Sequence, residues 1–122
     1  MILGARSKTK LEGVHPDLVA VVQLAIRNTE QDFSVIEGLR TVTRQRELLA
    51  AGKTTTMNSR HLKGHAVDLV PYPVSWDWKY FYPIAEAMKD AARELNVELE
   101  WGGDWKSFPD GPHFQLSWRD YP

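Results

Sequence analysis

The sequence predicts an α+β domain in which a small, largely antiparallel sheet is covered by packed helices. Helical periodicity is strongest near the start and in the middle of the chain, and short apolar runs of strand length lie between and after these segments. No segment repeats. With 122 residues, 43% of them hydrophobic and 25% charged, the chain has the size and composition of one globular domain over residues 1–122.

The first half of the chain predicts two helices around one strand. Apolar residues recur at helical spacing over residues 16–29, and His15 stands just before this helix as a residue of the helix start. Residues 33–37 form an apolar run of strand length that ends at a glycine. A second helix is expected over residues 44–50.

The middle of the chain predicts a loop, a strand and the longest helix. Residues 53–64 are polar and contain glycine, which is typical of a loop, and a strand follows at about 65–70. An apolar stripe over residues 76–95 indicates the longest helix. Pro83 lies inside this span, so we expect it to kink the helix or to mark its true start.

Two further short strands are expected over residues 97–101 and 113–117. A loop rich in glycine and aspartate joins them. Short strands linked in this way pair antiparallel, which completes the predicted fold class.

An aromatic run at the start of the long helix allows two interpretations. Stacking on sugar rings is one; packing in the core is the one we favour, because several of these residues fall on the apolar face of the predicted helix. The run consists of Trp76, Trp78, Tyr80, Phe81 and Tyr82.

Charge and cysteine content exclude several classes of protein and site. The net charge is −1 and the fifteen basic residues are scattered, whereas a nucleic-acid-binding protein shows a basic stripe. Without cysteine the chain has no disulfide, and any metal must be held by His, Asp or Glu. No stretch has the apolar length of a signal peptide or of a membrane span, so we expect no stable membrane association.

A first polar cluster lies where the loop meets the strand at 65–70. Side chains alternate along a strand, so Asp68 points to the face opposite His65. A lone buried carboxylate is costly unless it is paired or bound to a metal. His61, in the loop just before the strand, is therefore the better partner for Asp68, and Gly64 allows the backbone to bend back toward it.

A second polar cluster lies near the C-terminus. His113 and Gln115 share one face of the last strand, and Asp110 stands three residues before His113 across a turn. Taken singly, such residues are more often surface histidines or salt-bridged aspartates. Together, the two clusters provide two imidazoles and one carboxylate for a zinc ion, with a second carboxylate close by to act on a water.

These motifs resemble a known family. Ser59-x-His61-x-x-Gly64-x-Ala66-x-Asp68, followed by Asp110-x-x-His113, is similar to the zinc-binding signature of the D-Ala-D-Ala carboxypeptidase/VanY-like metallopeptidases, with their Hedgehog/D,D-peptidase-like fold. The chain most resembles the L-alanyl-D-glutamate peptidases that serve as bacteriophage endolysins, from about residue 37 to residue 115. The resemblance implies Zn²⁺ held by His61, Asp68 and His113, with Asp110 as the catalytic base.

Further residues have two interpretations each. Arg40 is expected to stabilise the oxyanion or contact substrate, as the resemblance suggests, or to be a surface arginine paired with Glu37. Ser59 either hydrogen-bonds the substrate or holds its loop. Trp101 and Trp105 flank a glycine pair near the expected site, and we expect them to form a wall for the substrate.

Two carboxylates near the site have no assigned role. Glu100 is a rival for the base, and Asp104 is a candidate to orient a histidine. The sequence leaves both open.

The resulting hypothesis is a zinc-dependent endolysin, a monomer, that hydrolyses the L-alanyl-D-glutamate bond of bacterial peptidoglycan. On the resemblance, it accumulates in the host cytoplasm and reaches the cell wall after the membrane is permeabilised. The alternatives are a D-Ala-D-Ala carboxypeptidase or dipeptidase, and a non-catalytic zinc-containing module that binds peptidoglycan. A structural zinc site normally has four protein ligands, whereas only three are found here.

Overall fold

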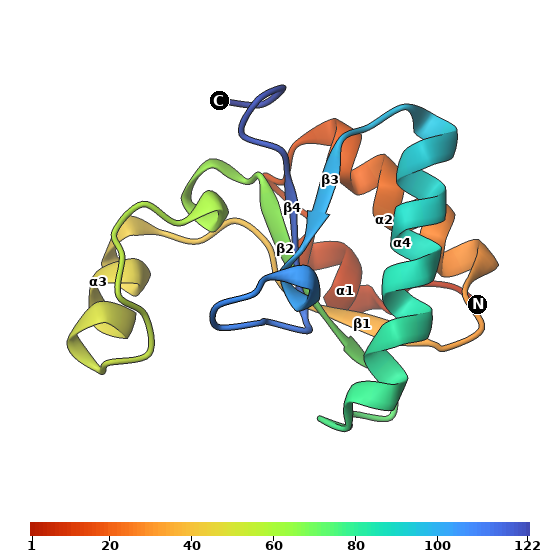
Figure 1. The fold of residues 1–122 in the computed structure, drawn as a ribbon, viewed down its shortest axis with the longest axis horizontal. Coiled ribbons are helices and arrows are strands. Elements are labelled where there is room, and N and C mark those ends of the chain that lie inside the picture. Colours follow the sequence, from red (N-terminus) through yellow and green to blue (C-terminus); the bar gives the residue numbers. More distant parts are fainter.

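A four-stranded antiparallel sheet forms the centre of the protein in the computed structural model, which describes all 122 residues (Figure 1). Its strands are β1 (Phe33–Glu37), β2 (Ala66–Pro71), β3 (Leu99–Trp101) and β4 (His113–Leu116). They lie in the order β1-β2-β4-β3, and every neighbouring pair is antiparallel. The predicted α+β class is therefore confirmed.

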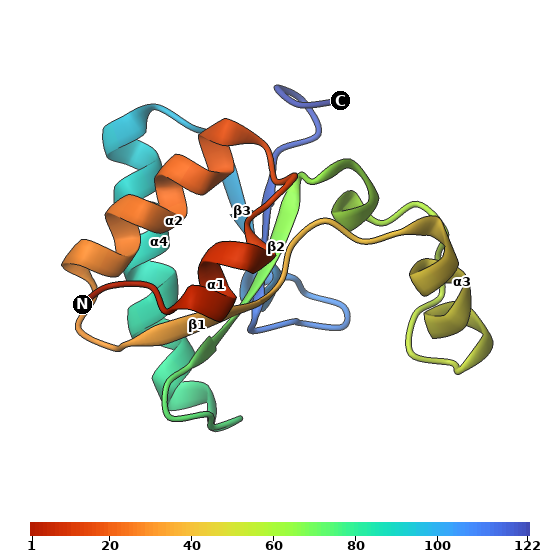
Figure 2. The same cartoon turned by 180° about the vertical axis from the view of Figure 1, so that it is seen from behind.

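Two long helices, α2 (Pro16–Asn28) and α4 (Phe81–Leu95), pack against each other on one side of the sheet (Figures 1 and 2). Their apolar faces bury side chains such as Leu18 and Met88 completely, and Phe114 reaches the same core from β4. Burial of these apolar side chains is the main stabilising contribution to such a fold.

The start of α2 is as predicted. The backbone N–H of Asp17 donates to His15 Nδ1 at 3.0 Å, so the imidazole caps the helix. Pro16 occupies the first turn, where its missing N–H removes no helical hydrogen bond. His15 is thus a structural residue of the helix start.

The longest helix begins later than residue 76. A 3-10 turn, η2 (Trp78–Tyr80), comes first, and α4 begins at Phe81. Pro83 lies in the first turn of α4, so it marks the start of the helix, one of the two expected outcomes.

The later start also corrects the interpretation of the aromatic run. Only Phe81 is fully packed in the core, with 2% of its surface exposed. Trp76, Trp78 and Tyr82 are 64%, 39% and 57% exposed. The apolar stripe of a helix that begins at Phe81 does not extend back to Trp76 and Trp78, because both precede the helix.

A short helix, α1 (Ala5–Lys10), was not predicted. Six residues are too few to show a helical period, and the helix depends on contacts with the rest of the chain. The backbone N–H of Val35 in β1 donates to Ser7 Oγ at 3.0 Å, and Leu3 and Leu11 at either end of α1 are buried.

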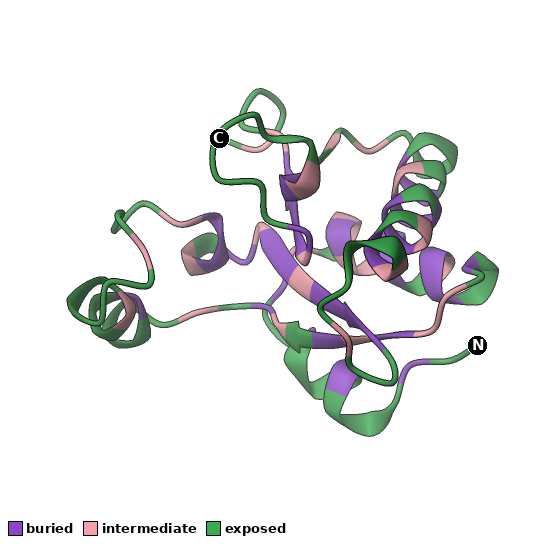
Figure 3. Ribbon diagram, turned by 60° about the horizontal axis from the view of Figure 1, so that its bottom comes forward, coloured by how far each residue is buried: buried purple, intermediate pink, exposed green.

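Helix α3 (Val42–Ala50) lies apart from the other helices, on the opposite side of the sheet (Figure 1). Thr41 caps it, and Gln45 is its one buried residue, so the helix is largely exposed to solvent (Figure 3). The polar segment after it ends in a 3-10 turn, η1 (Arg60–Lys63), within the span predicted as a loop.

Alternation along the strands separates the core from a polar face. Phe114 and Leu116 in β4 are fully buried in the core, whereas His113 and Gln115 point to the other face. Asp68 in β2 lies opposite His113 in the strand pairing and points to the same polar face. Helices α2 and α4 therefore cover one face of the sheet, and the site lies on the other. None of the helices is both long and apolar enough to span a bilayer.

Candidate metal centre and active site

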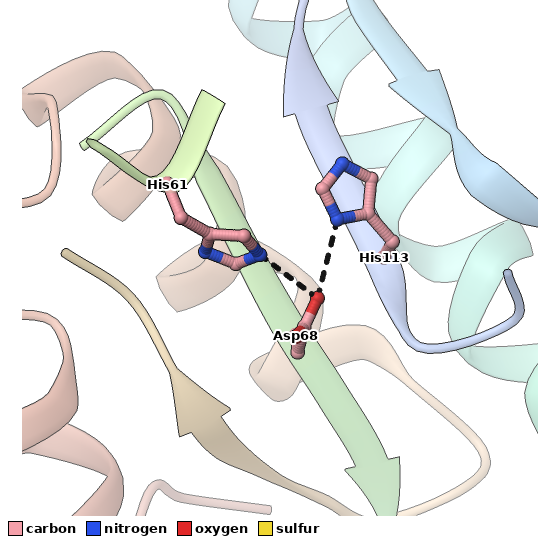
Figure 4. A group of neighbouring side chains, drawn as sticks. All are labelled: His61, Asp68 and His113. Carbon is pink, nitrogen blue, oxygen red and sulfur yellow. Dashed lines mark hydrogen bonds and ion pairs between the residues drawn. The ribbon is translucent and has the colours of Figure 1, made fainter. Parts of the chain in front are cut away.

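Three side chains that are distant in the sequence converge over strand β2 (Figure 4). His61 lies in η1, Asp68 in β2 and His113 at the first position of β4. His61 Nε2 is 3.2 Å from Asp68 Oδ1, and His113 Nδ1 is 3.3 Å from the same oxygen. One potential ligand atom from each residue lies within 4.8 Å of the other two.

The turn before β2 aims His61 at this point. Gly64 ends η1 with a φ of 71°, in the left-handed region that favours glycine. A Cβ at position 64 would lie 2.4 Å from the carbonyl oxygen of Gly13, so no larger residue fits without a shift of the backbone. His65 then faces away from Asp68, toward the rings of His15 and Tyr121, as alternation predicts.

The tautomer of His61 follows from its second hydrogen bond. Its Nδ1 lies 2.8 Å from the carbonyl oxygen of Gly38, in a buried contact. A carbonyl oxygen can only accept, so Nδ1 carries the hydrogen and donates it. Nε2 is left with a lone pair that points at Asp68.

The tautomer of His113 is set by Gln115 and Glu100. Gln115 Nε2 donates to Glu100 Oε2 at 2.7 Å, which turns Gln115 Oε1 toward His113 Nε2, also at 2.7 Å. His113 Nε2 therefore carries the hydrogen, and Nδ1 presents its lone pair to Asp68. Glu100 thus acts through Gln115. Asp104, in contrast, contacts no histidine; it accepts from Lys89 Nζ at 2.7 Å on the surface.

This arrangement favours a metal ion or a proton among the three residues. Two imidazole lone pairs and a carboxylate oxygen repel one another at 3.2–3.3 Å unless a proton or a metal ion lies between them. In the protein without a metal ion, a proton takes this place: burial alone would raise the pKa of Asp68, but hydrogen bonds donated by His113 and His61 outweigh it and hold this pKa below its ordinary value. Burial alone would lower the pKa of His113, and the hydrogen bond and charge of Asp68 raise it instead.

Two of the three distances between these atoms fit a metal ion. Ligand bonds of about 2.0–2.1 Å around a tetrahedral zinc place the ligand atoms roughly 3.3 Å apart. The distances from Asp68 Oδ1 to His61 Nε2 and to His113 Nδ1, 3.2 and 3.3 Å, agree with that edge. Nitrogen and carboxylate oxygen donors without thiolate suit zinc and related divalent ions.

Asp110 borders the same pocket from the loop between β3 and β4. Its backbone N–H donates to the carbonyl oxygen of Gly102 at 2.9 Å, and the His113 N–H donates to the Asp110 carbonyl at 3.2 Å. A Cβ at position 102 would lie 2.5 Å from that carbonyl oxygen, so the glycine permits the close approach. Although Asp110 is partly open to solvent, burial of its carboxyl in the pocket wall and the charge of Asp68 raise its pKa.

Arg40 is held firmly at the edge of the pocket. Its Nε and one terminal nitrogen donate to the two oxygens of Glu37 at 2.6 and 2.7 Å, and the other terminal nitrogen donates to Gln45 Oε1 at 2.7 Å. The expected pair with Glu37 is present, yet only 10% of the arginine side chain is exposed. Ser59 Oγ accepts from the His61 N–H at 3.2 Å, so Ser59 holds its turn as well as lining the pocket.

The pocket around these groups has a volume of about 530 Å³ and a mostly polar lining. Trp105 lines it, with its ring 5.2 Å from that of His113. Trp101 does not, and its expected role as a substrate wall is wrong. Its ring is buried and stacked on Phe114, and its Nε1 donates to the carbonyl oxygen of Gly111 at 2.7 Å.

Comparison with known proteins agrees with this geometry. The sequence profile of the family described as Phage L-alanyl-D-glutamate peptidase matches residues 1–116. The chain belongs to this family. The match includes the N-terminal helices, beyond the segment that carries the recognisable motifs.

Individual relatives support the assignment. The chain is 31% identical over 114 residues to the L-alanyl-D-glutamate peptidase of Escherichia phage T5, which covers 88% of this chain and 83% of the relative. It is 35% identical over 88 residues to that of Listeria phage A118, covering 71% of this chain and 31% of that longer protein. The crystal structure of the Serratia marcescens L-Ala D-Glu endopeptidase ChiX is similar throughout: 56% identity, a TM-score of 0.94, and coverage of 99% of this chain and 94% of the other.

Proposed function

We propose that this protein is a zinc-dependent endopeptidase that hydrolyses the L-alanyl-D-glutamate bond of peptidoglycan stem peptides. The convergence of His61, Asp68 and His113 on one point of a polar pocket carries the proposal. Family membership supports the bond that is cut, because the phage T5 relative and the Serratia structure are both named for it.

The metal role rests on three donors. Three protein ligands leave a fourth position of a tetrahedral ion open, which is the pattern of a catalytic rather than a structural zinc site. When bound, zinc lowers the pKa of a coordinated water to about 7 and polarises a carbonyl group. The tautomers of the two histidines support His61 Nε2 and His113 Nδ1 as the nitrogen ligands.

Asp110 is the proposed general base. It accepts the proton of the attacking water and returns it to the amino group of D-glutamate as the peptide bond breaks. Glu100, the rival carboxylate, is occupied by Gln115.

Arg40 is the proposed partner of the oxyanion. Arginine has five N–H donors. Four of them are directed at Glu37, Gln45 and Ser59, the last contact being long at 3.5 Å, so one N–H remains for substrate. Fixing the guanidinium in this way pre-organises a positive charge at the pocket edge. Ser59 and Trp105, which also line the pocket, are the proposed substrate contacts.

The setting of the activity is part of the proposal. The phage relatives suggest an endolysin-like role, in which a monomer made in the host cytoplasm acts on the cell wall after the membrane is permeabilised. Bacterial peptidoglycan is then its one macromolecular partner, and neither nucleic acid nor a membrane is bound.

Digestion of purified peptidoglycan tests the proposal. Mass spectrometry is expected to find new N-terminal D-glutamate; release of free D-alanine would support a carboxypeptidase instead. The Asp110→Asn variant is expected to retain about one zinc per chain and to lose cleavage by at least about 100-fold, as for loss of a general base. His113→Ala should lose both zinc and cleavage. Retained cleavage in Asp110→Asn would remove Asp110 from the mechanism, and zinc binding without any cleavage by the wild type would favour a non-catalytic module.

A further inference from the structure

We propose that an exposed aromatic surface next to the pocket binds the glycan strand from which the stem peptide extends. The aromatic surface consists of Trp76, Trp78 and Tyr82, around η2 and the start of α4. The inference rests on the proposed function and adds a second recognition site for the same substrate. Packing in the core does not explain these residues, because each leaves more than a third of its surface in solvent.

The three rings are connected through ring contacts, with buried Phe81 between Trp76 and Trp78. The Trp76 ring stacks on buried Phe81, with centroids 6.2 Å apart and planes at 25°. Trp78 lies 6.3 Å from Phe81 and 6.1 Å from Tyr82. A contiguous group of exposed aromatic rings is unusual for a soluble protein and is typical of a binding surface.

A buried residue holds this surface in place. Trp78 and Tyr82 lie against Trp101, with ring centroids at 6.2 and 5.9 Å. Trp101 itself is fixed by its hydrogen bond to Gly111 and by stacking on Phe114. Rings held in this way lose little conformational freedom on binding, so they can contribute to affinity.

The aromatic surface adjoins the site through Gly111. A Cβ at position 111 would lie 3.6 Å from Trp78 Cη2 and 3.4 Å from Phe81 Cγ. Gly111 directly follows Asp110, the proposed base, and consecutive Cα atoms are about 3.8 Å apart. Trp78, at the edge of the aromatic surface, therefore packs against the residue that follows Asp110 in the chain. Figure 1 shows η2 and the first turn of α4 near the loop that joins β3 to β4.

The substrate carries its sugar close to the scissile bond. The L-alanine of a stem peptide is joined to the lactyl group of a muramic acid, so the scissile carbonyl and the sugar are separated by two residue-like units. Two such units span about 7 Å. An enzyme that cuts this first bond must accommodate the sugar close to the base.

The chemistry of the surface fits a glycan. One face of a pyranose ring presents C–H groups that pack on an aromatic ring, while hydroxyl and acetamide groups stay hydrated at the edge. Most charged side chains beside the rings are paired: Lys79 lies 3.9 Å from Asp77, and Lys89 lies 2.7 Å from Asp104. Glu86, which lines a depression with Tyr82, has no ion-pair partner. The surface therefore carries little excess charge with which to select a strongly charged partner.

Two substrates with the same stem peptide test the inference. One is a muropeptide on a tetrasaccharide of N-acetylglucosamine and N-acetylmuramic acid; the other is the stem peptide with only a lactyl cap. The variants are Trp76→Ala and the double variant Trp76→Ala with Tyr82→Ala. Leu95→Ala is the control, because Leu95 is 40% exposed at the other end of α4. A third measurement needs no variant: glycan strands stripped of their peptides are added as an inhibitor of the wild type.

The aromatic surface predicts a substrate-specific loss. Each aromatic contact is worth roughly 2- to 12-fold in binding, so the double variant should lose about 5-fold or more in kcat/KM on the glycan-bearing muropeptide. Cleavage of the capped peptide should be unchanged, as should both activities of Leu95→Ala. Stripped glycan should inhibit cleavage by the wild type and inhibit the double variant less.

Several outcomes would overturn the inference. Equal losses of the double variant on both substrates would show a general defect. Equal cleavage of both substrates by the wild type, with no inhibition by stripped glycan, would show that the sugar is not bound. A wild-type dimer that Trp76→Ala dissociates would assign the surface to a second copy of the chain. A wild type that cleaves neither substrate would instead reject the proposed function, so the two failures are distinguishable.

Discussion

Gln115 offers a sharp test of how the site prepares a metal ligand. It accepts a hydrogen bond from His113 Nε2 and donates one to Glu100, each at 2.7 Å. Gln115→Leu keeps a side chain of similar size but removes both hydrogen bonds. The imidazole of His113 is then free to adopt the other tautomer or to rotate away from Asp68.

The expected effect is large for a residue that touches no metal. A hydrogen bond contributes about 0.5–1.5 kcal/mol, and leaving a buried N–H unpaired costs about 1–3 kcal/mol. Loss of the partner that orients a metal-binding histidine typically weakens metal affinity by about 10- to 100-fold. We therefore expect the Kd for zinc to rise by about 10- to 100-fold in Gln115→Leu.

Competition with a chelator of known affinity measures this Kd. A matched control exchanges the two partners: Glu100→Gln with Gln115→Glu keeps the net charge and the hydrogen-bond chain. The carboxylate at position 115 then accepts from His113 and from the amide at position 100, so zinc affinity should stay within about 3-fold of the wild type. Unchanged affinity in Gln115→Leu would refute the tautomer argument. If the variant with Glu100→Gln and Gln115→Glu does not bind zinc, altered packing would explain the loss of zinc affinity.

Three further predictions concern stability and substrate contact. Removing zinc should lower the midpoint of thermal unfolding by roughly 10 °C relative to protein with zinc at 100 times its Kd, because zinc binding at that concentration stabilises the fold by about 2.7 kcal/mol. An unchanged midpoint in calorimetry would argue against a resident ion. The hydrogen bond to Asp17 raises the pKa of Tyr121 to about 12, so its stabilisation is complete below pH 10 and is lost as the pH rises from 10 to 12. Urea unfolding should show this loss in the wild type, and it should be absent in Tyr121→Phe. Trp101→Ala should lower the free energy of unfolding by about 3–5 kcal/mol. Trp105→Ala should leave stability nearly unchanged and raise KM. The reverse pattern in denaturation and kinetics would show that Trp101, and not Trp105, contacts the substrate.

Much of the site was predictable because strand alternation is a strong constraint. A period of two places Asp68 opposite His65 and puts His113 with Gln115 on one face. The structure has both arrangements. What alternation cannot give is the pairing of strands, and the register that sets Asp68 opposite His113 appears only in the folded chain.

Other features depend on contacts that no local pattern encodes. The tautomer of His61 depends on a carbonyl 23 residues earlier in the chain. The flanking glycines predict a loop at the pocket for Trp101, whereas stacking on Phe114 draws its ring into the core. The apolar stripe predicts a helix from residue 76 and so places the aromatic run in the core, whereas α4 begins five residues later, at Phe81. The role of Glu100 follows from its position opposite Gln115 in the pairing of β3 with β4. That position is known only once the register of the two strands is known.

X-ray absorption and anomalous scattering at the zinc edge, on crystals of the zinc-loaded protein, test the central claim most directly. One ion is expected with His61 Nε2, His113 Nδ1 and an oxygen of Asp68 at about 2.0–2.1 Å, and with no fourth protein ligand. An ion at another place, a fourth protein ligand, or histidines bound through the opposite nitrogens would contradict the account.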